Sequence, residues 1–388
     1  MSVTTPAGFR AAGVPAGLKS SGAADVALVV NDGPQDAAAG VFTTNRFPAA
    51  PVLWSRQVLL DGRLRAVVLN SGGANACTGP EGFADTHATA EHTAEALGRA
   101  GLEIGAVDVA VASTGLIGVR LPMDRLLPGV TDAAKALAAD GGPDAARAIM
   151  TTDSVPKTTV VERDGWSVGG MAKGAGMLAP SLATMLVVLT TDAVVDPAVL
   201  QEALAAATGV SLERVDSDGC LSTNDTVIAM ANGAGGVTPS AEEVAEALTA
   251  AATDLAMQLL ADAEGSTKDI AITVRGAAGV QDALTAARAC ARNNLLKTAL
   301  FGNDPNWGRV LAAIGTTDAA FEPDRVDVAI NGVTVCRGGA IGDPREGVDL
   351  TGRAVTIDVD LRAGTEQATI WTNDLSIAYV HENSAYST

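Results

Sequence analysis

The hydrophobic positions of the chain follow two periods, which together predict a protein built from strands and helices. Short apolar runs rich in β-branched residues predict strands at 25–30, 65–70, 108–112, 158–162, 226–231, 270–275, 326–330 and 355–361. Longer stretches with apolar residues every three or four positions predict helices at 83–100, 132–139, 197–207, 241–261 and 282–293. The mixture predicts an α/β or α+β fold of mixed sheets with helices outside, and the strand order stays open.

The helix at 241–261 has the clearest start signal. Ser240 is a favourable N-cap residue, and Glu242 and Glu243 follow in the first turn, where carboxylates stabilise the helix N-terminus.

The segment 173–186 places Thr184 between a glycine-rich loop and an apolar run at 185–189 that predicts a buried strand. A threonine hydroxyl is a weak nucleophile that needs a base beside it, and the α-amine of an N-terminal threonine, with an ordinary pKa of about 7.7–8.0, is such a base. Thr184 would gain that amine if the chain were cut between Ala183 and Thr184. Most threonines inside a chain are structural, so the residues alone favour an ordinary strand start.

The same glycines match the dinucleotide-binding pattern, with Gly174, Gly176 and Ala179 in register and Asp192 downstream. That pattern must open a helix, but Pro180 intervenes and the next apolar strand follows almost at once. A phosphate-binding Walker loop is excluded as well, because Lys173 precedes its glycines.

Composition excludes several other classes. The 388 residues can form two or three domains, and the formal net charge of −19, spread along the chain, argues against nucleic-acid and anionic-membrane partners. The N-terminus lacks a targeting pattern, and no apolar run approaches about 18 residues, so a cytoplasmic protein is expected. Four separated cysteines and three histidines without ligand spacing predict neither a disulfide framework nor a metal site.

The segment 173–186, continued by Thr190-Thr191-Asp192-Ala193, resembles the self-cleaving threonine signature of the ornithine acetyltransferase family, the glutamate N-acetyltransferases of arginine biosynthesis. The resemblance implies layered mixed sheets sandwiched between helices, similar to the N-terminal-nucleophile hydrolases. It also implies cleavage into an N-terminal fragment, 1–183, and a C-terminal fragment, 184–388. The fragments would stay interlocked, and two copies of each would form a heterotetramer.

The reaction that the resemblance implies is acetyl transfer from N²-acetylornithine to glutamate through an acetyl-threonine at Thr184. It requires neither a metal nor an organic cofactor. Members of the family differ in whether acetyl-CoA also donates acetyl, so that second donor stays open.

The resemblance also carries roles for residues outside the threonine segment. Thr114 and Gly115, just after a predicted strand, match the oxyanion-hole positions; by themselves they would be an ordinary strand-to-turn glycine and its neighbour. Lys173 matches a position that binds substrate and could pair with a carboxylate, and Glu264 one that could hold the ornithine ammonium. Without the resemblance, both would be solvated side chains.

Further segments match less tightly. Thr151 and Thr152 resemble a pair of which one threonine contacts substrate, and either could make the contact. Asn383 and Thr388 belong to a C-terminal signature that would line the site; without the resemblance, a disordered tail would be expected there. Gly73 stands where the family pattern leads us to expect asparagine. The loop 216–225 fails the calcium-loop spacing and is interpreted as a polar loop beside the site, and 301–309 is expected to shape the pocket.

Two other functions stay open at this point. An amidase or aminopeptidase would use the same threonine but give the acyl group to water. A non-catalytic binding protein for acidic amino acids would keep the chain intact.

Overall fold

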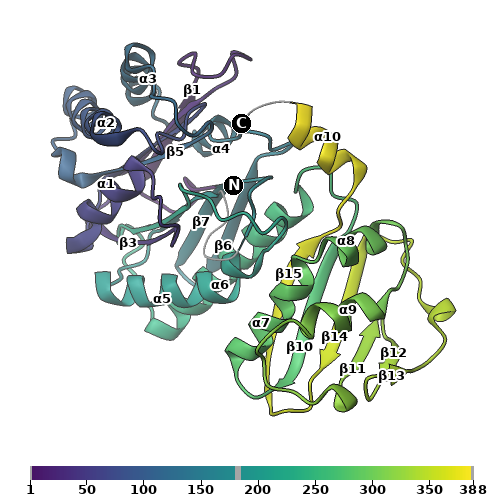
Figure 1. Cartoon of the computed structure of the whole chain (residues 1–388). Coiled ribbons are helices and arrows are strands. Elements are labelled where there is room, and N and C mark those ends of the chain that lie inside the picture. The colour runs from purple at the N-terminus through teal and green to yellow at the C-terminus, as the bar shows by residue number, and fades with distance from the viewer. Residues whose placement is uncertain (1, 180–184, 386–388) are drawn as a thin grey trace.

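The computed structural model describes residues 2–179 and 185–385, and its chain forms two lobes, the larger at upper left and the smaller at lower right in Figure 1. Ala183, Thr184 and Thr388 lie outside the described residues. Mixed sheets and helices confirm the predicted α/β class, and two of the sheets are stacked in layers.

The larger lobe contains a four-stranded and a five-stranded sheet. The first sheet has the order β1 (Phe9–Val14), β2 (Val26–Asn31), β4 (Ala66–Ser71), β5 (Val109–Thr114). The second has the order β3 (Ala37–Phe42), β9 (Thr226–Ala231), β8 (Leu186–Thr191), β7 (Trp166–Lys173), β6 (Lys157–Arg163). Each sheet combines one parallel pair with antiparallel neighbours.

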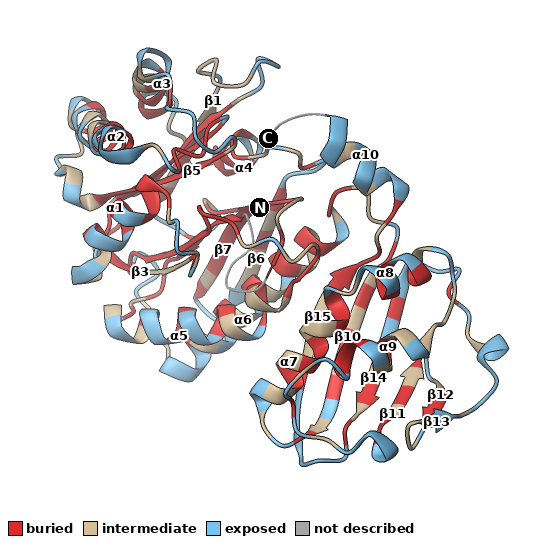
Figure 2. Cartoon of the chain, viewed as in Figure 1, coloured by how far each residue is buried: buried red, intermediate tan, exposed pale blue. Residues whose placement is uncertain are grey.

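The apolar run after Thr184 is buried because it lies in the middle of this stack. In β8, Leu186 and Val188 face the core shared with the first sheet, whereas Val187 and Leu189 face the core on the helical side. Successive side chains of a strand point to opposite faces, so a strand covered on both faces is apolar throughout. Strands β2, β4, β5, β8 and β9 are buried throughout, whereas the edge strands β1, β3 and β6 are partly exposed (Figure 2).

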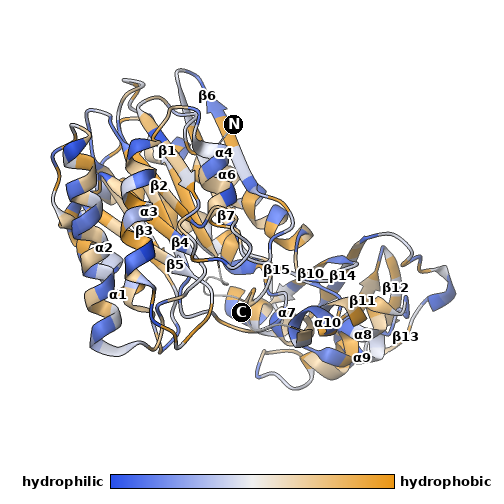
Figure 3. Ribbon diagram, turned by 90° about the horizontal axis from the view of Figure 1, so that it is seen from above, coloured by the Kyte–Doolittle hydropathy of each residue, from blue (hydrophilic) through white to orange (hydrophobic). Residues whose placement is uncertain are grey.

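Helices cover the outer faces of the two stacked sheets. On the first sheet lie α1 (Ala50–Val58), α2 (Gly79–Arg99) and α3 (Met123–Lys135), whereas α4 (Gly142–Ala148) contacts β1 and β2 of this sheet and also β6 and β7 of the second. On the second lie α5 (Pro197–Val210) and α6 (Ala241–Ala261). The helices are apolar toward the sheets and polar toward solvent (Figure 3).

The smaller lobe is a six-stranded sheet with its own core. Its order is β13 (Ala340–Ile341), β12 (Val333–Arg337), β11 (Asp327–Ile330), β14 (Ala354–Asp360), β10 (Asp269–Ala277), β15 (Glu366–Asn373). The lobe also contains α7 (Val280–Ala291), α8 (Asn294–Phe301) and α9 (Trp307–Ile314), and α10 (Ile377–Ala385) leads back to the larger lobe (Figure 1).

The capped helix was predicted with its full length. In α6, Ser240 Oγ accepts a hydrogen bond from Glu243 N and the Glu243 carboxylate accepts one from Ser240 N, which satisfies two amides at the helix start. Among the described residues, α6 alone has the length and apolar composition of a membrane span, and it packs against β6, β7 and α5 inside the lobe.

One predicted helix had the wrong bounds. The helix predicted at 132–139 begins at Met123, because a stripe containing Leu126 and Val130 packs into the core and overrides the loop signal of Pro128. The C-terminal signature, which the resemblance implies lines the site, forms α10 as far as Ala385.

Candidate active site

Seven of the predicted site residues line one pocket between the two lobes. They come from the ends of β5 and β7, the loop before β6, the chain after α6, and α10. These residues are Thr114, Gly115, Thr151, Thr152, Lys173, Glu264 and Asn383. Ile117, Gly176 and Met177 complete the lining.

Lys173 and Thr114 join the two stacked sheets at this pocket. Lys173 Nζ donates a hydrogen bond of 3.0 Å to Thr114 Oγ1, and both side chains are buried. Burial lowers the pKa of Lys173 below its ordinary value, although the carboxylate of Asp153 acts in the opposite direction. Lys173 is therefore a buried amine and not the solvated lysine that we would expect without the family resemblance.

Asp153 ties three parts of the pocket wall together. Its Oδ1 accepts hydrogen bonds from Lys157 Nζ (2.6 Å) and Gly174 N (2.7 Å), and its Oδ2 accepts one from Thr151 N (2.9 Å). Burial acts to raise the pKa of Asp153, but the charges of Lys173 and Lys157 outweigh it and the pKa lies below its ordinary value. The residue therefore stays ionised and holds the threonine pair beside the glycine-rich loop.

Lys157 extends this network to the end of α6. Its Nζ also contacts Asp262 Oδ2 at 2.6 Å, and the side chain is fully buried between the two carboxylates. Asp153 directly follows the threonine pair in the chain, but the sequence analysis assigned a role only to the threonines.

Gly115 has a backbone conformation that favours glycine. Its φ is +131°, and a Cβ atom there would lie 2.5 Å from Gly73 N. The amides of Gly72 and Gly73 both donate to the carbonyl oxygen of Thr114 over 3.0 Å. These bonds fix the turn after β4 against the turn after β5. Gly73 departs from the family pattern but fits here, because a Cβ at this position would approach Leu121 to 2.7 Å.

Glu264 explains the glycine-rich loop that resembles a nucleotide-binding pattern. A Cβ on Gly176 would lie 2.7 Å from the Glu264 carboxyl group, so a side chain at this loop position would displace that carboxyl group. Glu264 N donates to the carbonyl oxygen of Ala175 over 2.9 Å, and Asn383 Nδ2 donates to Glu264 Oε2 over 2.8 Å. The loop therefore packs on a carboxylate rather than on a phosphate.

Asp225 is a buried carboxyl group at the end of the loop 216–225, to which the sequence analysis assigned no role of its own. Its Oδ1 accepts the N–H of Met185, the residue that follows Thr184, over 3.1 Å. Its Oδ2 has no hydrogen-bond partner within the described part of the chain, and burial raises the pKa of Asp225 well above its ordinary value. Because Asp225 pairs with a residue 40 positions away, no local spacing marks it.

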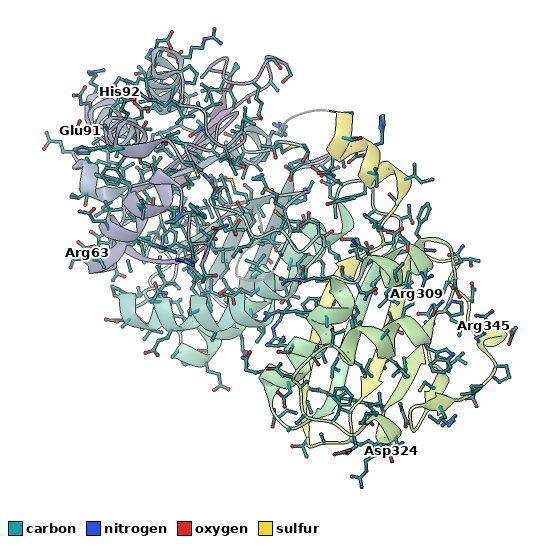
Figure 4. All side chains as sticks on the ribbon, in the orientation of Figure 1. Arg63, Glu91, His92, Arg309, Asp324 and Arg345 are labelled. Atoms are coloured by element: carbon teal, nitrogen blue, oxygen red, sulfur yellow. The ribbon has the colours of Figure 1, made fainter. Side chains whose placement is uncertain are left out.

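Other candidate residues lie elsewhere. The segment 301–309 does not line this pocket, contrary to expectation; it spans the end of α8 and the start of α9, and Arg309 lies on the smaller lobe (Figure 4). Its Asn306 caps α9 instead.

His92 lies on α2 and contacts Thr131. Across residues 2–179 and 185–385, no three His, Cys, Asp or Glu side chains are grouped as metal ligands.

The profile of the ArgJ family matches residues 10–388, which is almost the whole chain. The chain belongs to the ArgJ family. It is 64% identical over 387 residues to the arginine biosynthesis bifunctional protein ArgJ of Streptomyces avermitilis, with 100% of both chains covered. It is 59% identical over 388 residues to the protein of that name from Mycobacterium tuberculosis, covering 99% of this chain and 96% of the relative.

Two solved structures of ArgJ proteins were also found. The ornithine acetyltransferase of Mycobacterium tuberculosis, in complex with ornithine, matches with a TM-score of 0.46 and 64% identity over 48% of this chain and 96% of its own. The Bacillus halodurans ArgJ protein matches with a TM-score of 0.48 and 35% identity over 51% of this chain and 97% of its own.

Proposed function

We propose that this ArgJ family member is a glutamate N-acetyltransferase, which moves acetyl from N²-acetylornithine to glutamate in arginine biosynthesis. The relatives that it matches over 96–100% of their length are named arginine biosynthesis bifunctional proteins. The observation that carries the proposal is the pocket itself, where a hydroxyl and a glycine (Thr114, Gly115), a buried amine (Lys173) and a carboxylate (Glu264) meet. These are the groups that an acyl transfer between two amino acids requires.

The first step in this proposal is self-cleavage. Thr184 Oγ attacks the carbonyl carbon of Ala183, the Ala183–Thr184 amide bond breaks, and the amine of Thr184 is released as an ester forms. Water then hydrolyses that ester to the Ala183 carboxylate and the free Thr184 hydroxyl. The product carries an N-terminal threonine whose own amine can act as a base.

The sheet order supports fragments, 1–183 and 184–388, that stay interlocked after such a cut. The cut would fall between β7 and β8, which are antiparallel neighbours in the five-stranded sheet. β3, β6 and β7 would belong to the first fragment, and β8 and β9 to the second. Separation would require breaking strand pairs in the centre of a sheet that is covered on both faces.

The second step is transfer of the acetyl group to the threonine. The Thr184 amine accepts the hydroxyl proton, Oγ attacks the acetyl carbonyl, and ornithine leaves with its nitrogen reprotonated. Thr114 and Gly115 stabilise the negative charge that develops on the carbonyl oxygen. The bond from Lys173 supports this role, because Thr114 Oγ1 already accepts a hydrogen bond and its own proton is free to be donated.

The third step returns the enzyme to its starting state. The α-amine of glutamate attacks the acetyl-threonine ester, and N-acetylglutamate leaves as Thr184 recovers its proton. Lys173 holds a substrate carboxylate and Glu264 the ornithine ammonium, with Asn383, Thr388 and one of Thr151 and Thr152 as further contacts. Burial of Lys173 and the bond from Asn383 to Glu264 support these assignments.

The proposal includes three further properties. The enzyme works in the cytoplasm, assembles as a heterotetramer of two copies of each fragment, and needs no metal or organic cofactor. Acetyl-CoA is retained as a second acetyl donor to be tested.

Intact mass under denaturing conditions, measured on fresh wild-type protein beside Thr184→Ala, tests the proposal. We expect two fragments from the wild type, the second beginning at Thr184, and one uncut chain from the variant. The wild type is then incubated with N²-acetylornithine, with and without glutamate. Formation of N-acetylglutamate supports the proposal; release of acetate alone identifies a hydrolase, and an uncut, inactive wild type would leave a binding protein.

A further inference from the structure

A second pocket adjoins the candidate active site and shares Glu264 with it. Its walls come from the loop after η3 (Leu212–Arg214), the corner between α7 and α8, and the chain from β15 into α10. Tyr379 lines this pocket, and Asn383, one turn later in α10, lines the first. Glu264 therefore stands at the boundary between two spaces that a substrate side chain can enter.

Three carboxylates line the second pocket, and two of them, Asp374 and Asp218, accept hydrogen bonds from the protein backbone; the third is Glu264. Asp374 Oδ1 accepts the amides of Thr267 and Lys268, each at 2.8 Å. Asp218 Oδ1 accepts the amide of Cys220 at 3.0 Å, and burial raises the pKa of this carboxyl group. Neither carboxylate is a bare negative charge facing the pocket.

The two cations of the second pocket, Arg292 and Lys297, have N–H groups that no described protein atom accepts. Arg292 Nε donates to Asp216 Oδ2 over 2.8 Å, but the two terminal nitrogens have no hydrogen-bond partner within the described part of the chain. The Arg292 side chain is 46% exposed, so a ligand can reach it. Lys297 is buried and donates to Ser217 O and Thr372 Oγ1, which leaves the third proton of its ammonium group.

The proposed reaction creates a charge problem that this arrangement can solve. Two amino acids must use one site in turn, and their side chains end in opposite charges: an ammonium in ornithine and a carboxylate in glutamate. Glu264 attracts the first and repels the second, and like charges brought close together are unfavourable. A second, positive position is needed for the acceptor.

We propose that Arg292, supported by Lys297, receives the side-chain carboxylate of the acceptor glutamate, while Glu264 holds the side-chain ammonium of the donor. This inference rests on the proposed function. A guanidinium whose Nε is fixed by Asp216 presents its terminal nitrogens in a defined direction, which suits a carboxylate better than a mobile lysine would.

The test compares glutamate with glutamine as acceptor, at fixed N²-acetylornithine, for the wild type, Arg292→Gln and Arg325→Gln. Arg325 is an exposed arginine of the same lobe outside both pockets, and its variant controls for the loss of one charge. We expect Arg292→Gln to lower kcat/KM for glutamate by about 10- to 100-fold, the range of one hydrogen bond to a charged group. The values for glutamine and the KM for N²-acetylornithine should be unchanged, and Arg325→Gln should match the wild type.

Arg292→Lys guards against a folding defect, because it retains a positive charge opposite Asp216; we expect it to recover part of the preference for glutamate. Glu264→Gln should instead affect the donor: we expect it to raise the KM for N²-acetylornithine, which Arg292→Gln leaves unchanged. If Arg292→Gln loses activity equally toward glutamate and glutamine, the inference is overturned although acetyl transfer stands. A wild type that transfers acetyl to neither acceptor would instead overturn the proposed function.

Discussion

Lys173 at the end of β7 and Thr114 at the end of β5 form a hydrogen bond that crosses from one stacked sheet to the other. The ammonium group is the donor, so the oxygen of Thr114 is an acceptor and its hydrogen can point into the pocket. The same bond places the buried amine of Lys173 next to the proposed oxyanion position. Charge that develops there is stabilised by groups that are already in place.

Thr114→Val therefore removes the proposed donor while keeping the shape of the side chain. We expect kcat for acetyl transfer to fall by about 10²–10³-fold, the usual cost of one oxyanion donor. Thr114→Ser should retain most of the activity. Steady-state kinetics on cleaved protein measure the effect, and a Thr114→Val enzyme with wild-type kcat would rule out this role.

Gly115→Ala tests the backbone of the same turn. The new Cβ would meet Gly73 N at 2.5 Å in a conformation with φ of +131°, so the turn must shift. We expect a fall in kcat comparable to that of Thr114→Val, with thermal unfolding of the rest of the lobe little changed. Gly118→Ala is the matched control, since its φ is also positive, +82°, but no atom lies within 4 Å of its Cβ position. Equal losses in both variants would mean that backbone strain, not the contact with Gly73, is responsible.

Much of the fold could be predicted from the sequence because burial leaves a local pattern. The strand at 226–231 and the helix at 241–261 were predicted with their observed bounds, the first from an apolar run and the second from its cap. The helix around Pro128 was misplaced, because packing of Leu126 and Val130 has no signature as strong as that of proline.

The site was predicted less evenly, for a physical reason. Thr114, Lys173 and Glu264 stood out through motifs, and the fold brings them to one pocket. Asp225 and Asp153 did not, because their importance comes from partners far away in the chain. Lys157, for instance, joins Asp153 to Asp262, 105 residues beyond it. Ion pairs of this kind depend on the finished fold and leave no spacing to recognise.

Asp153→Asn should destabilise the protein, because it removes one of two carboxylates from the fully buried Lys157. We expect a loss of about 3 kcal/mol in the free energy of unfolding at pH 7, the lower end of the cost of breaking a buried pair. Since the folded-state pKa of Asp153 lies below its ordinary value, its contribution is complete above pH 4 or so and is lost as the pH falls through the folded-state pKa.

Urea unfolding of wild type and Asp153→Asn between pH 7 and pH 3 measures this contribution. The difference between the two stabilities should be constant above about pH 4 and should narrow as the pH falls from there toward 3. Asp144→Asn, which breaks an exposed pair with Arg147, is the control and should change stability little at any pH. A constant difference between wild type and Asp153→Asn across the range would contradict the assigned ionisation.

Lys297 predicts a second pH dependence of the same sign, at alkaline pH, in the smaller lobe. Burial lowers the pKa of this amine from 10.5 to about 8, against the attraction of nearby carboxylates. Between these two values the unfolded chain holds a proton that the folded chain has released. Stability therefore rises as the pH increases from about 8 to about 10.5, by roughly 3 kcal/mol if this group acted alone. Below that window Lys297 contributes no pH dependence, because it is protonated in both the folded and the unfolded chain.

Lys297→Met should abolish that rise, whatever its effect on stability at pH 7, where the lost hydrogen bonds to Ser217 and Thr372 also count. The quantity to compare is the slope of unfolding free energy against pH from 7.5 to 10.5, determined by urea unfolding, for wild type, Lys297→Met and Lys135→Met. Lys135 is 72% exposed, so its variant should keep the wild-type slope. If Lys297→Met also keeps it, the ammonium group is not destabilised by burial, and Lys297 is a fully charged partner of Arg292 throughout the working pH range.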